Sequence, residues 1–184
     1  MKLVDKKLQA VWNSADCLHS ADELEQGVQG MAMRIRKNLH DQNPLILCIM
    51  NGGLVTCGQL LPLLDFQLQL EYVNAASGPS GKQETRWPAL SQISIAGRSV
   101  LLLDDIFDLG LSLHSLKEYC LEQGATQVQT GVLVEKQHER EKKDIAIDYR
   151  AVAVGDRFIF GAGLDYQGYL RNAPGIYAVA EKQL

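Results

Sequence analysis

The sequence predicts a doubly wound α/β fold, in which a mostly parallel sheet carries helices on both faces. Apolar runs of strand length alternate with segments of helical periodicity, as in a chain of β-α-β units. The apolar runs lack polar alternation, which is typical of strands that are covered on both faces. One of them, residues 99–103, is followed at once by two acids, and open α/β sheets bind ligands at the carboxyl ends of their strands.

Length and composition favour one domain over residues 1–184. The chain has 184 residues, of which 46% are hydrophobic and 22% charged, so it can bury a core of its own. A net charge of −4 argues against general nucleic-acid binding but leaves an anionic small substrate open. No run approaches about 18 consecutive apolar residues, so no membrane contact is expected. With four cysteines in no metal-binding pattern and no signal-peptide pattern, we expect a cytoplasmic, reduced protein.

The first clear element is an amphipathic helix. Ser20 and Glu23 form a capping-box pattern at its start. Apolar residues then recur at helical spacing, namely Leu24, Val28, Met31, Ile35 and Leu39. A continuous apolar strand over Leu45–Met50, a helix over 54–64 and a strand over 67–73 are predicted to follow.

The second half of the chain continues the alternation. A helix is predicted over 113–123, and the strands are predicted over 127–134, 149–154, 158–161 and 176–180. Residues 137–143 are highly charged and are expected to be exposed. Residues 74–94 are rich in Gly, Ser and Pro at their start, and so long an insertion predicts a lid or another functional loop.

Residues 99–113, SVLLLDDIFDLGLSL, carry the main functional signal. Asp104 and Asp105 follow the predicted strand and can bind sugar hydroxyls, and Asp108 adds a third acid. Gly110 and Ser112 stand where a helix begins, and backbone N–H groups at such a point bind phosphate well. The residues predict a site for a phosphorylated sugar, and a solvated loop or the Mg²⁺ site of another α/β protein are the alternatives.

The whole string resembles the phosphoribosyl diphosphate (PRPP) signature of type I phosphoribosyltransferases. Three further segments, in order, resemble the hypoxanthine-guanine phosphoribosyltransferases: ILCIMNGGL at 46–54, VLVEK at 132–136 and DRFIFGAGLDYQGYLRN at 156–172. The last is typical of the purine-salvage branch and is not expected in the orotate or adenine branches. The resemblance implies the type I phosphoribosyltransferase fold, with a small hood formed by N- and C-terminal segments, and a homodimer or homotetramer.

The resemblance also implies a reaction, in which a 6-oxopurine is joined to the ribose of PRPP and pyrophosphate is expelled. Asp104 and Asp105 would bind the ribose hydroxyls, directly or through Mg²⁺ and water. Asp108 would be the general acid/base at purine N7. The 5′-phosphate would be held by Asp108, Leu109, Gly110, Leu111 and Ser112.

Three residues are assigned to the purine by the same resemblance. Lys136 would donate to the 6-oxo group, against the bland alternative of a solvated lysine. Phe158 would stack on the base, with core packing as its alternative, and Ile159 would offer backbone groups to the purine edge.

The pyrophosphate end is assigned likewise. Asn51, Gly52 and Gly53 would form the loop whose N–H groups face the anion, and Arg171 would meet it too unless it forms only a surface salt bridge. Asp165, placed near the purine, would help to hold the expected cofactor Mg²⁺ on the pyrophosphate.

The chain departs from the family pattern at three places. Many relatives carry Lys where Asn51 stands and Thr where Leu109 stands, and residues 74–81 lack the Tyr of the usual mobile loop. A regulatory protein that binds PRPP or a nucleotide is therefore the alternative to an active enzyme. The four histidines show no ligand spacing and are interpreted as ordinary, namely His19, His40, His114 and His138.

Overall fold

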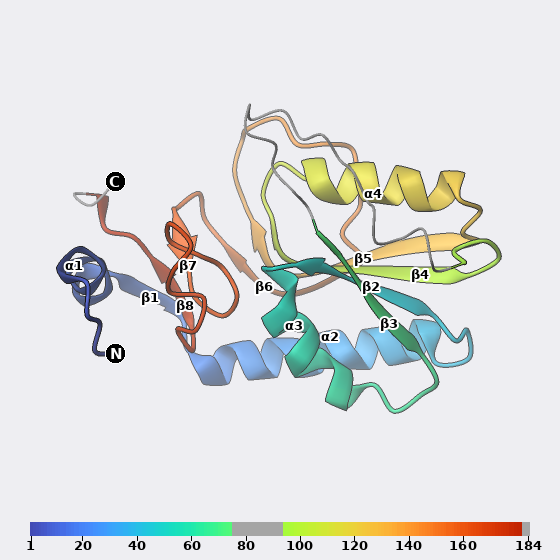
Figure 1. Ribbon diagram of the computed structural model, residues 1–184, viewed down its shortest axis with the longest axis horizontal. Coiled ribbons are helices and arrows are strands. Elements are labelled where there is room, and N and C mark those ends of the chain that lie inside the picture. Colours follow the sequence, from blue (N-terminus) through green and yellow to red (C-terminus); the bar gives the residue numbers. More distant parts are fainter. Residues whose placement is uncertain (75–93, 182–184) are drawn as a thin grey trace.

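The computed structural model describes residues 1–74 and 94–181, which form a central parallel sheet and a smaller antiparallel one (Figure 1). The central sheet has the order β3-β2-β4-β5-β6. Its strands are β2 (Leu45–Met50), β3 (Gln69–Asn74), β4 (Ser99–Phe107), β5 (Gln127–Lys136) and β6 (Tyr149–Val154). The smaller sheet has the order β1-β8-β7 and consists of β1 (Asp16–His19), β7 (Ile159–Phe160) and β8 (Ile176–Ala178). The predicted doubly wound sheet and the hood built from both ends of the chain are confirmed.

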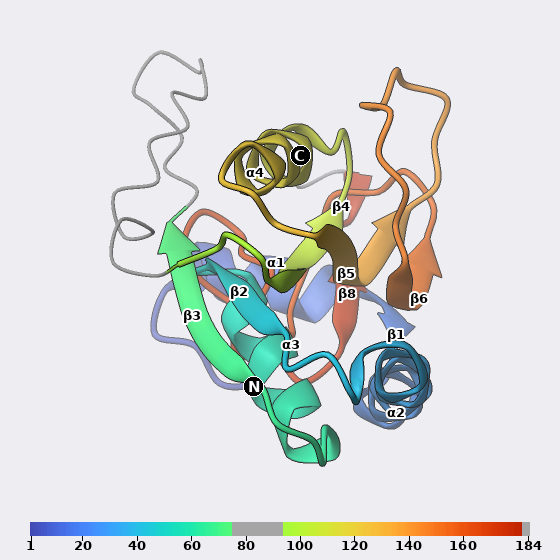
Figure 2. The ribbon, with the colours of Figure 1, turned by 90° about the vertical axis from the view of Figure 1, so that its right-hand side faces the viewer.

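Helices cover both faces of the central sheet, as Figure 2 shows, with α4 on one side and α2 and α3 on the other. The helices are α1 (Lys6–Ser14), α2 (Ala21–Leu39), α3 (Gly53–Leu60) with a 3₁₀ turn at Leu61–Leu63, and α4 (Leu111–Glu122). The predicted capping box of α2 is present, because Ser20 and Glu23 each accept a backbone N–H of the other. Since α3 follows β2 and α4 follows the neighbouring β4, the winding reverses between these two strands, and ligands bind at such a switch point.

The side chains of β4 divide between two cores. Leu101 and Leu103 pack in the core beneath α2 and α3, whereas Val100 and Leu102 pack in the core beneath α4. This explains the continuous apolar run, since a strand covered on both faces needs apolar side chains at every position.

The predicted end of β4 at residue 103 is wrong. Backbone pairing with β5 continues to Phe107, which lies opposite Glu135, so Asp104 and Asp105 lie within the strand. The alternation of side chains changes at these acids, because Ile106 packs with the α2 and α3 core and Phe107 with the α4 core. Backbone hydrogen bonds form whatever the side chain, so the acids mark a change of surroundings rather than the end of the strand.

The hood includes a helix that the sequence did not reveal. Asp5 caps α1 by accepting from Lys7 N at 2.7 Å. Trp12 of α1 lies 4.8 Å from Tyr177 and 6.3 Å from Phe160, measured between ring centroids, and so attaches the helix to β7 and β8. Within the described residues, no helix has the length and apolar character needed to cross a membrane.

The predicted lid over 74–94 lies, apart from its first and last residues, outside the described residues.

Candidate active site

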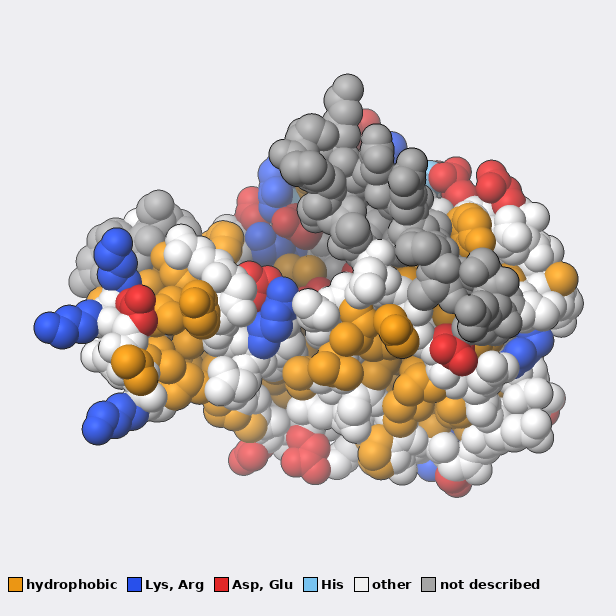
Figure 3. Space-filling view, viewed as in Figure 1, with side chains coloured by type: hydrophobic (Ala, Val, Ile, Leu, Met, Phe, Trp, Pro, Cys, Tyr) orange, Lys and Arg blue, Asp and Glu red, His pale blue; other side chains and the backbone are white. Residues whose placement is uncertain are grey.

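A pocket of about 370 Å³ opens at the switch point between β2 and β4. Figure 3 shows acidic and basic side chains gathered in the hollow between the hood and the central sheet. The predicted PRPP-binding residues that line the pocket are Asn51, Gly52, Asp104, Asp105, Asp108, Leu109, Gly110, Leu111, Ser112 and Arg171, and Asp165 joins them. Lys136, Phe158 and Ile159 do not line this part of the cavity, but Lys136 is linked to it through Asp108.

Two glycines let the start of α3 lie against the acids of β4. A Cβ at Gly52 would overlap the carboxylate of Asp105, and one at Gly53 would stand 2.7 Å from the carbonyl oxygen of Leu103. The peptide bond between Met50 and Asn51, just before them, is cis. The backbone of Asn51 and Gly52, directly before α3, lines the pocket, and the dipole of the helix favours an anion at this end.

Asp104 and Asp105 form an acidic pair in the floor of the pocket. Burial raises the pKa of Asp104 well above its usual range, and the neighbouring charge of Asp105 adds to the shift. Burial also raises the pKa of Asp105, although its contact with Asp104 and the charge of Arg171 oppose the shift. Two partly desolvated carboxylates are costly to ionise together, so hydroxyl donors or a cation brought by a ligand would stabilise them.

Gly110 turns the chain from β4 into α4. Its φ of 77° lies in the left-handed region, which glycine adopts without steric strain, and it occupies the N-cap position. A Cβ at Gly110 would collide with the ring of Phe107. The first turn of α4, with Leu111 and Ser112, therefore presents its backbone N–H groups to the pocket, as a phosphate site requires.

Arg171 and Asp165 close the pocket from the hood. Arg171 Nη2 lies 2.6 Å from Asp165 Oδ1, and its Nη1 donates to the carbonyl oxygen of Gly163 at 2.6 Å and lies 3.9 Å from Asp105 Oδ2. The backbone of Gly163 also packs closely on that of Gly52. Arg171 thus forms a salt bridge with Asp165, as the alternative interpretation of this residue predicted, but both residues line the pocket.

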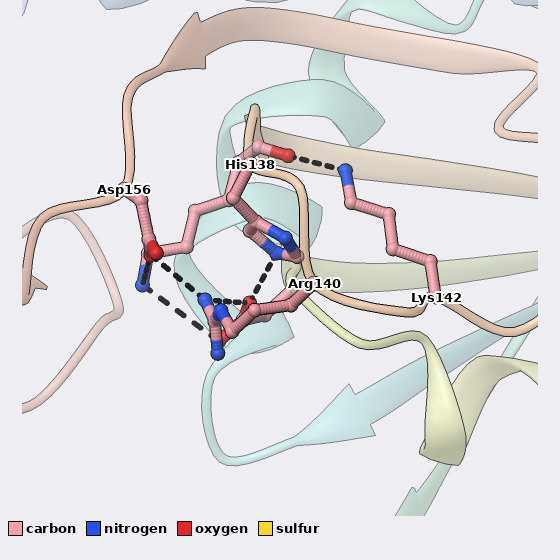
Figure 4. A network of polar contacts seen from close by, with 6 residues as sticks. His138, Arg140, Lys142 and Asp156 are labelled. Carbon is pink, nitrogen blue, oxygen red and sulfur yellow. Dashed lines mark hydrogen bonds and ion pairs between the residues drawn. The ribbon is translucent and has the colours of Figure 1, made fainter.

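The other end of the pocket holds a network of polar side chains, among them His138, Arg140 and Asp156 (Figure 4). His138 Nε2 lies 2.7 Å and Arg140 Nη2 2.8 Å from Asp108 Oδ1, and Lys136 Nζ lies 3.7 Å from Asp108 Oδ2. Arg140 and Lys136 also reach Asp156 Oδ1, at 2.8 and 3.5 Å. Desolvation opposes ionisation of Asp156, but the two cations together hold the pKa of Asp156 below its usual value.

Two sequence interpretations fail in this network. Lys136 is only 8% exposed, so it is not a solvated lysine. The His138 side chain is only 2% exposed and touches Asp108, so His138 is not an ordinary histidine, although most of the segment over 137–143 is exposed, as predicted. Neither His138 nor Arg140 stands at a recognisable spacing from Asp108, since about thirty residues separate them, whereas Asp156 could have been noticed as the first residue of the segment 156–172.

Phe158 and Ile159 are neighbours in the hood, but the first side chain is exposed and the second is buried. Phe158 is 46% exposed and meets Tyr166 edge to face, with the ring centroids 5.8 Å apart, so core packing is the wrong interpretation of this ring. Ile159 is buried, and its backbone lies in β7 opposite Ala178 of β8.

The acids of the pocket suit Mg²⁺ only in part. Among the described residues, no group of three or more His, Cys, Asp or Glu side chains could hold a metal ion. Magnesium, however, is commonly bound by one or two carboxylates together with substrate phosphates and water. Asp165 beside Arg171, and the pair Asp104 and Asp105, fit that mode of binding.

The fold and the pocket define a class of protein. A helix N-terminus at a switch point suits a phosphate, and the adjacent acids are acceptors for sugar hydroxyls, so the pocket suits a phosphorylated sugar. The family model described as "Phosphoribosyl transferase domain" matches residues 14–167, and the chain belongs to this family.

Known proteins that are similar to the chain are phosphoribosyltransferases as well. A hypoxanthine-guanine-xanthine phosphoribosyltransferase of Tritrichomonas foetus is 29% identical over 167 residues, which cover 89% of this chain and 91% of that protein. A hypoxanthine-guanine phosphoribosyltransferase of Bacillus subtilis is 29% identical over 160 residues, covering 85% and 88%. The crystal structure of a hypoxanthine-guanine phosphoribosyltransferase from Bacillus anthracis is similar with a TM-score of 0.79 and 26% identity, covering 90% of this chain and 98% of that one.

Proposed function

We propose that the protein transfers the phosphoribosyl group of PRPP to hypoxanthine or guanine, which gives IMP or GMP and pyrophosphate. The observation that carries the choice of base is the pair formed by Lys136 Nζ and Asp108 Oδ2, 3.7 Å apart. A 6-oxopurine presents O6 and N7 on the same edge. Lys136 donates to O6 while Asp108 accepts the proton of N7, and adenine, with an amino group in place of O6, offers Lys136 no acceptor.

PRPP lies along the pocket away from Lys136. The first turn of α4, from Gly110 to Ser112, binds the 5′-phosphate, because its N–H groups and the hydroxyl of Ser112 are donors. The hydroxyls of the ribose lie at Asp104 and Asp105, where they donate hydrogen bonds that stabilise the two buried carboxylates. This assignment is supported by the raised pKa of both acids, which marks a polar pair that the protein itself does not fully solvate.

The pyrophosphate lies between α3 and the hood. The backbone N–H groups near Asn51 and Gly52 and the guanidinium of Arg171 face it. Asp165, with Asp104 and Asp105 through water, would hold Mg²⁺, and the ion would neutralise the charge of the departing pyrophosphate. Phe158, exposed at the hood, packs on the purine ring, and the backbone of Ile159 borders the purine edge.

The reaction breaks one bond, forms one bond and transfers one proton. The bond between C1′ of the ribose and the pyrophosphate oxygen breaks, and a bond from C1′ to N9 of the purine forms. The proton on N7 passes to Asp108. The residues of the protein therefore bind and orient PRPP and the purine, and Asp108 takes up one proton.

The test is a product assay with purified protein, PRPP and Mg²⁺, in which hypoxanthine, guanine, xanthine and adenine are offered separately. We expect nucleotide from hypoxanthine or guanine and little from adenine. Binding of PRPP or GMP without turnover of any base would contradict the enzyme and favour a nucleotide-binding regulator, the alternative suggested by Leu109, Asn51 and the residues 74–81. Omitting Mg²⁺ tests the cofactor in the same assay.

Two further expectations belong to this proposal. We propose a homodimer or homotetramer, to be measured by light scattering, and a cytoplasmic location, to be measured by cell fractionation. A net charge of −4 supports small-molecule substrates rather than nucleic acid as partners.

A further inference from the structure

Two side chains hold Asp108 in place, and neither has a part in the function proposed above. The hydrogen bonds from His138 Nε2, at 2.7 Å, and Arg140 Nη2, at 2.8 Å, both end on Asp108 Oδ1. Figure 4 shows His138 and Arg140 in this network. The other carboxylate oxygen, Oδ2, is the one that lies near Lys136. The two donors therefore fix which oxygen of Asp108 is available beside the lysine.

The two donors differ in how firmly they act. The His138 side chain is 2% exposed, whereas that of Arg140 is 45% exposed and also hydrogen bonds to Asp156. An exposed ion pair is weak, because water screens it and a long side chain loses conformational freedom in it. The buried imidazole of His138 is therefore the more rigid support for Asp108.

The backbone around His138 is anchored at both sides. Gln137 N donates to the carbonyl oxygen of Val154 at 2.8 Å, and Lys143 N donates to that of Leu109 at 2.9 Å. The first bond ties the segment to β6 and the second ties it to the turn that leads into α4. His138 is therefore held relative to both the sheet and the phosphate-binding turn.

The surroundings of His138 indicate its tautomer. Its Nδ1 is buried and has no hydrogen-bond partner in the part of the chain that the structure describes. Its Nε2 carries a proton, because the carboxylate oxygen of Asp108 that it meets is an acceptor. A proton relay through the ring would need a partner at Nδ1, and so the geometry favours orientation of Asp108 over relay.

We propose that His138 is a positioning residue for phosphoribosyl transfer, a role that rests on the function proposed above. Its hydrogen bond to Oδ1 keeps Oδ2 of Asp108 beside Lys136, where the N7 and O6 edge of the purine binds. Oδ2 then takes the N7 proton as N9 bonds to C1′ and pyrophosphate leaves. His138 itself touches neither substrate.

The experiment compares three variants. His138→Ala removes the donor, His138→Gln replaces it with an amide N–H of similar reach, and Glu139→Ala alters an exposed neighbour as the matched control. We expect His138→Ala to lower kcat roughly 10- to 100-fold with the KM for PRPP changed less than about twofold, because misorientation affects the proton transfer and not phosphate binding. His138→Gln restores most of kcat, and Glu139→Ala has the wild-type kcat and KM.

The melting temperature of each variant and the ¹⁵N shifts of the His138 ring accompany the kinetics. A His138→Ala variant with wild-type kcat, or one in which kcat and the KM for PRPP change together and glutamine rescues neither, overturns the role of His138 while the proposed function stands. A ring that is not the Nε2–H tautomer overturns it as well. A wild-type protein that turns over no base overturns the proposed function itself, which the wild-type assay alone distinguishes.

Discussion

The two ends of the pocket differ in how closely their acidic side chains are paired with basic ones. At the end that we propose for the purine (the purine end), Asp108 and Asp156 are shared among Lys136, Arg140 and His138, at 2.7 to 3.7 Å. At the end that we propose for the ribose (the ribose end), Asp104 and Asp105 stand next to each other, and Arg171 is 3.9 Å from one of them while it pairs more closely with Asp165. The purine end is thus organised before any ligand arrives, whereas the ribose end is stabilised fully only when hydroxyls or a cation join it.

The largest effect should come from removing the acid around which the purine end is built. Asp108→Asn keeps the shape of the side chain but cannot accept a proton, so we expect kcat to fall roughly 10²- to 10⁴-fold. Nucleotide binding should weaken far less, because the phosphate and ribose contacts remain. Initial rates and calorimetric titration with GMP measure the two quantities, and an equal loss in both would remove Asp108 from its acid/base role.

A smaller effect is expected from the donor at the same end. Lys136→Ala deletes the group that faces O6 and leaves the purine oxygen without its partner, which costs about 1–3 kcal/mol, or roughly 5- to 150-fold in kcat/KM for hypoxanthine. The low activity with adenine should change little, so the preference for 6-oxopurines shrinks. Arg157→Ala, which removes an ion pair to Asp16 elsewhere on the hood, is the control. An unchanged preference would place Lys136 outside the base site.

The smallest effect concerns stability at the ribose end. Because burial and Asp105 raise the pKa of Asp104 above 3.8, the folded state binds a proton more tightly than the unfolded state does. The resulting stabilisation is complete below about pH 3.8 and is lost as the pH rises through the folded pKa. Asp104→Asn stays neutral and can still accept the 2.9 Å hydrogen bond from Asp105 N, so it avoids that loss.

The variant should therefore melt above the wild type at pH 8, by about 2–4 °C for each kcal/mol gained, and the difference should shrink toward pH 5. Thermal melts of both proteins without ligand, at several pH values, measure it. A difference that grows as the pH falls would show that burial does not raise the pKa of Asp104.

Local patterns predicted much of this molecule. The bounds of β2 and the cap of α2 followed from a continuous apolar run and from the spacing of Ser20 and Glu23, because both depend on neighbours in the sequence. The acids and the glycine that line the pocket before α4 were also predicted to lie together, since one short segment contains them all.

The rest depends on contacts between distant segments. His138 meets Asp108 only because the chain after β5 folds back, anchored by Gln137 and Lys143, and no sequence spacing encodes that path. Helix α1 was missed because it has only nine residues, too few for its apolar residues to repeat over several turns. The length of β4 was misjudged because backbone pairing continued past side chains that had turned polar.

The pairing of β1 with β8 links the order of synthesis on the ribosome to the order in which the pocket is completed. β1 precedes the central sheet in the chain and its partner β8 follows it, and among the described residues β7 pairs with β8 alone. The five strands of the central sheet lie between them, so the nascent chain has all of that sheet before the hood has its middle strand. Phe158, Asp165 and Arg171 also follow all five strands of the central sheet, so the hood's side of the pocket is synthesised after that sheet.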